Sequence, residues 1–447
     1  MTGEERLRIA ERLLALAERE GASDAEVVVL ETDAALTRFA NSEVHQNVAE
    51  TGTIASLRFV DGRRSGVASS GRLDDDGLRR LAEDAARVAR VQPEADEPAA
   101  LPEPGPVSRP AGAWSEATAG ATPEQRADGV AAVIAAADAA GVVAFGSFST
   151  STDGLAVAST RGIRVEQSTT QARLVAICMA DEEGSGYGEA LAVDIAEIDA
   201  AAVGAEAARR AARSRRPATM APGTYPVVLE PYAVADVLEW VGTLGFSALA
   251  VEEGRSFFEP GRRIASGLVS AWDDASDPAG TPSAFDFEGV GRQRVPLIDG
   301  GLCAGLVHDA ATAARAGRRS TGHGFLAPNP YGPAPINLFM APGETDPAAL
   351  LSGLDRGLLV TRLNYTNAVH PKRAIVTGMT RDGTFLVEHG EIVRPVRNLR
   401  FTQSYLDALA AVEAVGRERR RLAAEWATCV VPGLRISAWD FTGTTGD

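Results

Sequence analysis

The chain has 447 residues, enough for two or three domains that each bury a core of their own. Hydrophobic residues make up 45% of it and charged residues 23%, as in ordinary globular proteins. The formal net charge of −16 comes without a basic stripe, which argues against a nucleic-acid binder. Every apolar run falls short of the roughly 18 residues that a spanning helix needs, so we expect no association with a membrane.

The N-terminal sequence and the cysteines indicate a compartment. The first 21 residues are charged throughout and lack the continuous apolar region of a signal peptide. The three cysteines, Cys178, Cys303 and Cys429, are far apart and odd in number, which argues against a disulfide framework. We therefore expect a cytoplasmic protein.

The first half of the chain alternates between helical patterns and antiparallel strands. Thr122, Pro123 and Gln125 show how a helix start is recognised: a capping threonine, a proline at the first helical position, and a glutamine that closes a capping box. The predicted helices cover about residues 3–20, 73–90, 122–140 and 194–214. The strands between them are predicted to turn at Asp61–Gly62, Gly71, Asp153–Gly154 and Arg161–Gly162.

The second half is predicted to be richer in strands and loops. A strand at 224–230 precedes a helix over 232–249, and a long region rich in glycine and proline follows. Closer to the C-terminus, the patterns predict hairpin turns at Asp382–Gly383 and His389–Gly390, a helix over 404–427 and a last strand over 433–441.

These patterns predict an α+β chain of two domains. Residues 1–216 form an antiparallel sheet with flanking helices, and the proline-rich stretch 92–121 is a surface connection within that domain. Residues 217–447 form a β-rich domain, like a barrel or sandwich, with a few helices that include 232–249. The boundary is set by Ser214–Gly223, which follows a helix and carries two prolines and a glycine.

No local motif for a metal or a nucleophile is present. The five histidines are isolated from one another, and neither a histidine pair at i,i+4 nor a C-x-x-C occurs. A metal site assembled from Cys303, His308 and His323 stays open as an alternative, as does a catalytic Cys303–His308 pair. Cys303 lies between apolar stretches, which is more typical of a small buried hydrophobic residue.

Two further stretches have an ordinary interpretation and a functional one. Asp273, Asp274 and Asp277 have the oxygen ligands of a cation site, but a solvated turn with a proline is the more typical interpretation. Gly184–Gly188 is rich in glycine without the strand, helix and lysine of a phosphate-binding loop, so it indicates a flexible loop.

The helix over 232–249 contains the stretch Leu238-Glu239-Trp240-Val241-Gly242-Thr243. Its apolar residues cover a broad face, which indicates core packing. Leu238 and Thr243 lie five positions apart, roughly 140° around a helix, so they need not share a role. Taken alone, this is an apolar helix with an unexpected glutamate.

Longer blocks around this helix resemble the TldD/PmbA family, also described as peptidase family U62 or modulator of DNA gyrase. The resemblance covers most of the chain, and its most specific part runs from GLLVTRLNYTNAVHPKRA to FTQSYLDAL. The blocks that carry it are residues 38–47, 223–242, 253–266, 286–309 and 357–409.

The resemblance implies that a metal site is missing from this chain. TldD-like members carry H-E-x-x-x-H and a later cysteine that bind zinc, whereas Leu238 and Thr243 stand at the two histidine positions here. Glu239 matches the general-base glutamate, which cannot generate hydroxide at neutral pH without a metal-bound water. Cys429 lies near the position of the cysteine ligand but lacks the glycine-rich surroundings expected there, so the ligand role is not carried over. We therefore expect neither a catalytic residue nor a cofactor in this chain.

The resemblance also implies a role. A TldE/PmbA-like chain would pair with a TldD-like, zinc-bearing catalytic subunit, and the heterodimer would process unfolded peptides or precursors of peptide natural products. Peptide would bind in extended form, because backbone pairing suits substrates of varied sequence. The sequence does not assign the residues that contact peptide; the polar stretch Asn364–Asn367 is noted without a role. Two alternatives stay open: an autonomous peptidase with a divergent site, and a homo-oligomeric peptide-binding or scaffold protein.

Overall fold

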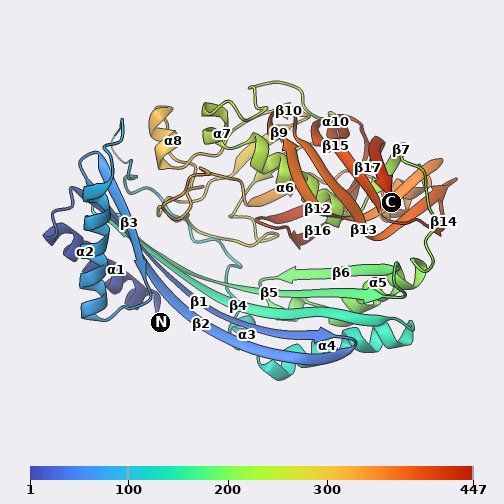
Figure 1. Cartoon of the computed structure of the whole chain (residues 1–447), viewed down its shortest axis with the longest axis horizontal. Coiled ribbons are helices and arrows are strands. Elements are labelled where there is room, and N and C mark those ends of the chain that lie inside the picture. The colour runs from blue at the N-terminus through green and yellow to red at the C-terminus, as the bar shows by residue number, and fades with distance from the viewer. Residues whose placement is uncertain (98–99, 445–447) are drawn as a thin grey trace.

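The computed structural model describes residues 1–97 and 100–444 and contains two sheets. The first half forms a six-stranded sheet, and the second half forms an eleven-stranded mixed sheet. The long strands of the first sheet curve around the second half of the chain (Figure 1). No helix in the described ranges combines the length and the apolar character that a bilayer crossing requires.

The N-terminal sheet is antiparallel throughout, in the order β3-β2-β1-β4-β5-β6. Its strands are β1 (Asp24–Ala40), β2 (Glu43–Asp61), β3 (Arg64–Ser70), β4 (Val143–Ser159), β5 (Arg164–Met179) and β6 (Ser185–Ala192). The helices of this half are α1 (Gly3–Arg19), α2 (Asp75–Val91), α3 (Glu116–Ala119), α4 (Pro123–Ala139) and α5 (Ala200–Arg213), with a 3-10 turn η1 (Ile195–Glu197) before α5.

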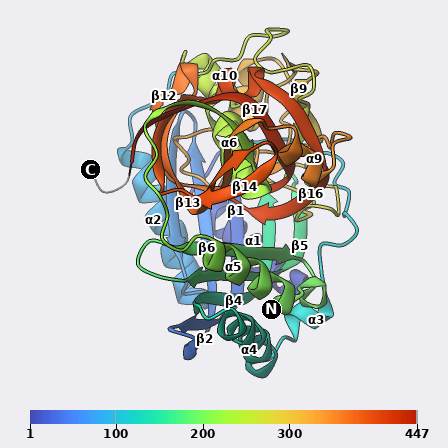
Figure 2. The same cartoon turned by 90° about the vertical axis from the view of Figure 1, so that its right-hand side faces the viewer.

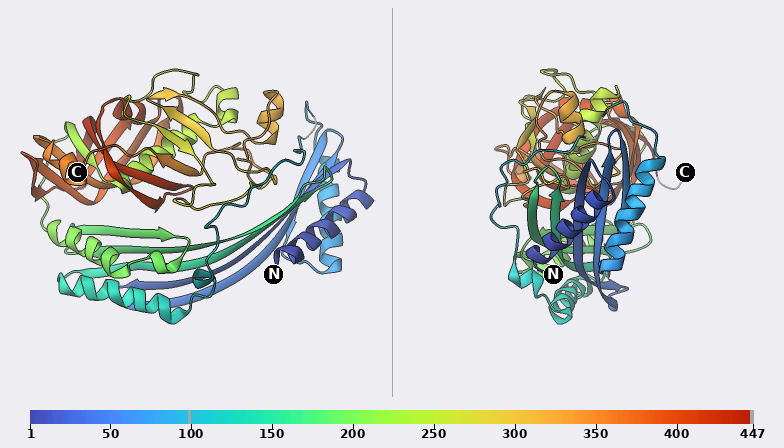
Figure 3. Two further views of the ribbon diagram at one scale, coloured as in Figure 1. Left: turned by 180° about the vertical axis from the view of Figure 1, so that it is seen from behind. Right: turned by 90° about the vertical axis from the view of Figure 1, so that its left-hand side faces the viewer.

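One face of this sheet carries the long helices, and the other faces the second half of the chain. Side chains alternate along a strand, so Val27, Val29 and Phe39 of β1 share a face. Val27 and Val29 pack with α1 and α2, and Phe39 packs with α4 and α5. Val28 points to the opposite face, where it joins Phe285 of the second half. Figure 3 shows the same arrangement from behind, with the helices outside the curve.

Five strands of the second half close into a ring, because β7 pairs with both β12 and β17. Seen along its axis in Figure 2, the ring encircles α6, whose apolar side chains lie in the largest core cluster. The strands are β7 (Gly223–Leu229), β8 (Ala271–Asp273), β9 (Val295–Asp299), β10 (Leu302–Cys303), β11 (Asn337–Met340), β12 (Arg356–His370), β13 (Ile375–Glu388), β14 (Glu391–Pro395), β15 (Leu399–Ser404), β16 (Val412–Ala423) and β17 (Thr428–Thr444). The helices are α6 (Pro231–Gly245), α7 (Ala248–Glu252), α8 (Ala310–Arg315), α9 (Pro347–Ser352) and α10 (Tyr405–Ala410), with a 3-10 turn η2 (Pro371–Arg373).

The predicted fold class is confirmed: an antiparallel sheet with helices in the first half, and a large mixed sheet with few helices in the second. The chain crosses from one sheet to the other between α5 and β7. We propose the domain boundary at this crossing.

The predicted helix over 404–427 is wrong. Only Tyr405–Ala410 is helical, and Val412–Ala423 forms β16, which pairs with β17. The segment is rich in glutamate, arginine and alanine, which favour a helix locally. Pairing with a strand later in the chain outweighs that preference, since strand formation is decided by cross-strand neighbours.

Two predicted turns are also wrong. Asp153–Gly154 lies within β4 and Asp382–Gly383 within β13, and each strand continues past the dipeptide without a reversal of direction. At the second site the backbone takes positive φ angles of 59° and 125°, in a bulge opposite β12. The turn dipeptide therefore marks a bulge there, whereas Arg161–Gly162 and His389–Gly390 do connect adjacent strands.

Two other segments differ from expectation in detail. The helix predicted over 232–249 divides into α6 and α7. The expected flexible loop at Gly184–Gly188 is mostly strand β6, packed under α5. A Cβ atom on Gly186 would lie 2.2 Å from the Ala207 carbonyl oxygen, so glycine permits this close approach.

Candidate functional site

A cleft separates the curved sheet from the second half of the chain. It consists of two adjoining cavities of about 580 and about 550 Å³, which share Arg173 and residues 423–425 as lining. The first cavity is bordered by α6, β5, β6, β12 and the end of β16. The second continues along β1, β4 and β5 toward residues 281–287. Gln167, Gln171 and Arg173 of β5 alternate with the core residues of that strand, so the cleft lies on the face opposite the helices.

Helix α6 presents three polar residues to this region. Asp236, Glu239 and Trp240 occupy positions i, i+3 and i+4, so they share one face of the helix. Asp236 and Glu239 line the first cavity. The other faces of α6 are apolar and packed in the core, which leaves little freedom for the helix to shift.

Glu239 binds the turn between β16 and β17. Its Oε1 accepts the backbone N–H groups of Trp426 at 2.6 Å and Ala427 at 2.9 Å, and its Oε2 accepts that of Glu425 at 3.2 Å. Burial raises the pKa of Glu239, and the three N–H bonds oppose that rise. The neighbouring Trp240 ring meets the Trp426 ring edge-to-face, with 5.7 Å between centroids. The carboxylate is therefore engaged as a backbone anchor.

Asp236 binds strand β12 and helix α10. Its carboxylate accepts hydrogen bonds from the Thr366 hydroxyl at 2.6 Å and the Tyr405 hydroxyl at 2.8 Å. The Trp240 indole N–H also donates to the Thr366 hydroxyl oxygen, at 3.0 Å. Burial raises the pKa of Asp236 to about 7, and the negative charge of nearby Glu239 adds to the rise. One face of α6 thus holds the β12 segment as well as the β16–β17 turn.

The structure places the predicted degenerate metal positions around this same helix. Leu238 is 1% exposed in the apolar core, and Thr243 is half-buried; neither belongs to the lining of the two cleft cavities. Cys429 lies against α6, with its Sγ 3.7 Å from the Ala235 carbonyl oxygen. Burial holds the pKa of the Cys429 thiol well above its usual value, so it stays protonated at neutral pH.

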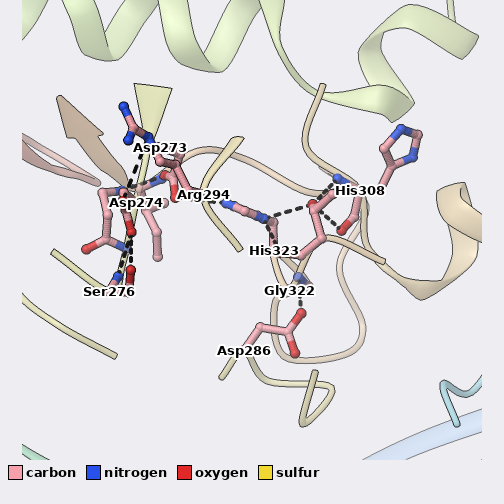
Figure 4. A network of polar contacts seen from close by, with 12 residues as sticks. Asp273, Asp274, Ser276, Asp286, Arg294, His308, Gly322 and His323 are labelled. Carbon is pink, nitrogen blue, oxygen red and sulfur yellow. Dashed lines mark hydrogen bonds and ion pairs between the residues drawn. The ribbon is translucent and has the colours of Figure 1, made fainter. Parts of the chain in front are cut away.

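The two histidines of the alternative metal site, His308 and His323, do not face a common point. His323 donates from Nε2 to the Asp273 carboxylate at 2.9 Å, and the second carboxylate oxygen accepts the backbone N–H groups of Ile336 and Asn337. Figure 4 shows the His308 ring pointing away from that of His323. Within residues 1–97 and 100–444, no group of three His, Cys, Asp or Glu side chains is arranged to hold a metal ion. The expected solvated turn is wrong for Asp273 and Asp274, which are both buried.

Cys303 fits its structural interpretation. It is buried on β10 and its thiol pKa is raised by burial, as for a small hydrophobic residue. Burial lowers the pKa of His308, which keeps its ring neutral. In the described part of the chain, no hydrogen bond joins the two side chains.

Sequence reasoning assigned no role to most of the residues that build the cleft; it noted the stretch Asn364–Asn367 but not its contacts with α6. Thr366 and Tyr405 lie 130 and 169 positions from Asp236, so no local pattern links them. The available signal was on the helix itself: Asp236, Glu239 and the indole N–H of Trp240 place polar groups on one face of a largely apolar element.

Comparisons with known proteins agree with this architecture. Models of the PmbA/TldA metallopeptidase family match residues 25–89 (domain 1), 118–215 (central domain) and 222–443 (C-terminal domain). A Synechocystis sp. metalloprotease is 28% identical over 261 residues, which are 57% of this chain and 51% of that protein. A Methanocaldococcus jannaschii metalloprotease is 24% identical over 266 residues, 58% of each chain. The chain thus spans about half the length of the curated relatives it matches.

Solved structures show the same fold over nearly the whole chain. TldE from Thermococcus kodakarensis has a TM-score of 0.89 at 19% identity and covers 97% of this chain and 99% of its own. A Thermotoga maritima protein described as a candidate modulator of DNA gyrase has a TM-score of 0.87 at 22% identity, with 98% and 100% covered. At these identities the likeness shows the fold alone. Because the three family models follow one another along most of the sequence, the chain belongs to the PmbA/TldD metallopeptidase family.

Proposed function

We propose that this chain is the metal-free, non-catalytic subunit of a heterodimeric zinc peptidase of the TldD/TldE type. The observation that carries the proposal is the set of residues that α6 has at positions 238, 239 and 243. Leucine and threonine stand at the ligand positions 238 and 243, and the Glu239 carboxylate is engaged by three backbone N–H groups. Three of the roughly four lone-pair sites of this carboxylate accept backbone N–H groups, so its acceptor capacity is largely used by the protein itself.

The cleft supports a role in holding peptide. It lies between a sheet and a loop-rich layer, and polar side chains of β5 border it along much of its length. Grooves of this kind suit extended chains, whose backbone groups find donors and acceptors regardless of sequence. In the proposed complex, this chain would help enclose unfolded peptide, and the zinc-binding, TldD-like subunit would supply the hydrolytic activity. The buried free cysteines fit the cytoplasm as the compartment.

The comparisons support the assignment to the TldE type. The curated relatives are named metalloproteases, and one of the similar folds is a TldE. The contacts of Glu239 favour the partner-subunit role over an autonomous peptidase. The glutamate at the position of the family's general base binds the backbone of the β16–β17 turn instead.

Reconstitution tests the proposal. The purified chain is expected to contain no stoichiometric zinc and to leave an unfolded, casein-like peptide intact, whereas mixing it with a TldD-like chain from the same source yields a zinc-bearing complex that cleaves the peptide. The measurements are metal content by mass spectrometry, complex mass by light scattering, and peptide cleavage by chromatography. Chelator-sensitive hydrolysis by this chain alone would establish the autonomous alternative, and a homodimer that ignores the TldD-like chain would establish the scaffold alternative.

Matched variants assign the catalytic role within the complex. Glu239→Gln in this chain retains one carbonyl acceptor for the β16–β17 turn, so we expect kcat of the complex to change less than about threefold. The equivalent glutamate-to-glutamine change in the H-E-x-x-x-H helix of the TldD-like chain removes a general base and is expected to lower kcat by at least about a hundredfold. Equal losses from the two variants would contradict the non-catalytic assignment.

A further inference from the structure

Strand β12 carries a distorted segment where it lines the first cavity. Asn364 pairs with Met379 and Asn367 with Thr377, so β12 has one residue more than β13 between these pairs. This is a β-bulge, a feature that re-aims side chains. At the bulge Tyr365 has φ of 52°, in the left-handed region that bulky residues seldom adopt.

Three hydrogen bonds hold this conformation. Thr366 is turned inward, where its hydroxyl bonds Asp236 and the Trp240 indole. The Asn367 side-chain amide donates to the Tyr365 carbonyl oxygen at 3.1 Å. The neighbouring Tyr365 side chain, by contrast, is 77% exposed and lines the first cavity. Strain of this kind persists only where surrounding contacts impose it, and such positions cluster at functional sites.

The two arginines that line the cavity are paired within the protein. Arg173 binds Glu189 at 3.0 Å, and Arg362 binds Asp382 at 2.6 Å. These guanidinium groups therefore have carboxylate partners before any ligand arrives. Tyr365 adds an exposed aromatic ring to the same lining. Rings of this type contact apolar and aromatic side chains over a large area at little cost in side-chain entropy.

We propose that Tyr365 is a binding residue of the cleft, and that it receives an aromatic or large apolar side chain of an extended peptide. The proposal rests on the peptide-holding function above and narrows it to a class of substrate: unfolded peptides that carry such a residue. Thr366 is the positioning residue, because its two bonds to α6 keep the bulge in place.

The test measures binding of two fluorescein-labelled peptides to the full chain, and to its complex with a TldD-like chain inactivated at its glutamate. The peptides are unstructured twelve-residue chains that differ only in a central phenylalanine or alanine. The wild type is expected to prefer the phenylalanine peptide by about tenfold in Kd. Tyr365→Ala should remove that preference and leave the Kd for the alanine peptide nearly unchanged.

Three further variants distinguish a direct contact between Tyr365 and peptide from an indirect effect of the substitution on folding. Tyr331→Ala removes another exposed tyrosine, 83% exposed and outside the cleft lining, and is expected to leave both affinities unchanged. Thr366→Val keeps the side-chain size but removes both bonds, and should lower the preference with Tyr365 still present. Tyr365→Gly relieves the left-handed backbone, so it should raise the unfolding temperature while the preference is lost.

The outcomes distinguish this inference from the proposed function. Equal affinities of the wild type for both peptides would overturn the role of Tyr365 and leave a sequence-independent peptide cleft standing. A preference that survives Tyr365→Ala would do the same. If Tyr365→Ala abolishes assembly with the TldD-like chain but spares the preference, the ring belongs to the subunit interface and the inference is overturned. If neither peptide binds the chain or the complex, the peptide-holding function itself is contradicted, and the role of Tyr365 with it.

Discussion

Replacing Glu239 with alanine is expected to lower the free energy of unfolding by about 3 kcal/mol, because backbone donors lose their acceptor. The N–H groups of Trp426 and Ala427 bond one carboxylate oxygen at 2.6 and 2.9 Å, and Ala427 is buried. A buried N–H left without a partner costs about 1–3 kcal/mol, and a donor to a charged acceptor loses more than one to a neutral group. Urea unfolding followed by circular dichroism measures the change.

The effect should also be visible locally. Trp426 sits on the turn that Glu239 holds, and its ring contacts Trp240. Loss of the anchor should loosen the turn and shift tryptophan fluorescence before global unfolding. Glu425→Ala is the control, since Glu425 is exposed on the same turn and its removal should cost less than about 0.5 kcal/mol. A Glu239→Ala variant as stable as that control would show that the carboxylate does not anchor the turn.

Replacing Asp236 with asparagine is expected to remove a pH dependence of stability. The pKa of Asp236 is about 7 in the folded chain, against 3.8 ordinarily. Below about pH 4 the group is protonated in both the folded and unfolded states, and its stabilising contribution is fully present. Between about pH 4 and 7 the unfolded chain releases the proton and the folded chain retains it, so that contribution is lost as pH rises. The full loss corresponds to about 4 kcal/mol.

Asparagine fills the same space without a charge, so its contribution should not change over this pH range. Relative to the wild type, Asp236→Asn is expected to gain stability progressively from pH 5 to pH 8, with the largest gap at pH 8. Urea unfolding at both pH values measures this. Asp84→Asn, at an exposed position of α2, is the control, and its free energy of unfolding should change with pH in the same way as that of the wild type. A constant gap between Asp236→Asn and the wild type would contradict the raised pKa.

Both predictions concern the polar face of helix α6, which carries Asp236 and Glu239. The polar face of helix α6 binds two segments of the second half that border the cleft, β12 and the β16–β17 turn. Asp236 and Trp240 hold the β12 bulge, and Glu239 holds the β16–β17 turn. In our proposal, the helix has kept a role in shaping the cleft without the chemistry.

Local sequence patterns were reliable where local interactions decide the structure. The capping box of Thr122 and Gln125 is present as predicted, because both partners lie within one helical turn. The turn at His389–Gly390 also forms, with positive φ at both residues, as a two-residue hairpin requires. The apolar face of the helix over 232–249 correctly indicated burial in a core.

By itself, the sequence determined the fold class, the capped helices and the family, since long ordered blocks and local periodicities need no knowledge of distant contacts. Only the tertiary structure decided that 412–423 is a strand, because its partner β17 follows later and supplies the pairing. It also decided the site: Asp236 meets Thr366 and Tyr405 across 130 and 169 positions. Such contacts depend on closure of the strand ring around α6, which no local pattern encodes.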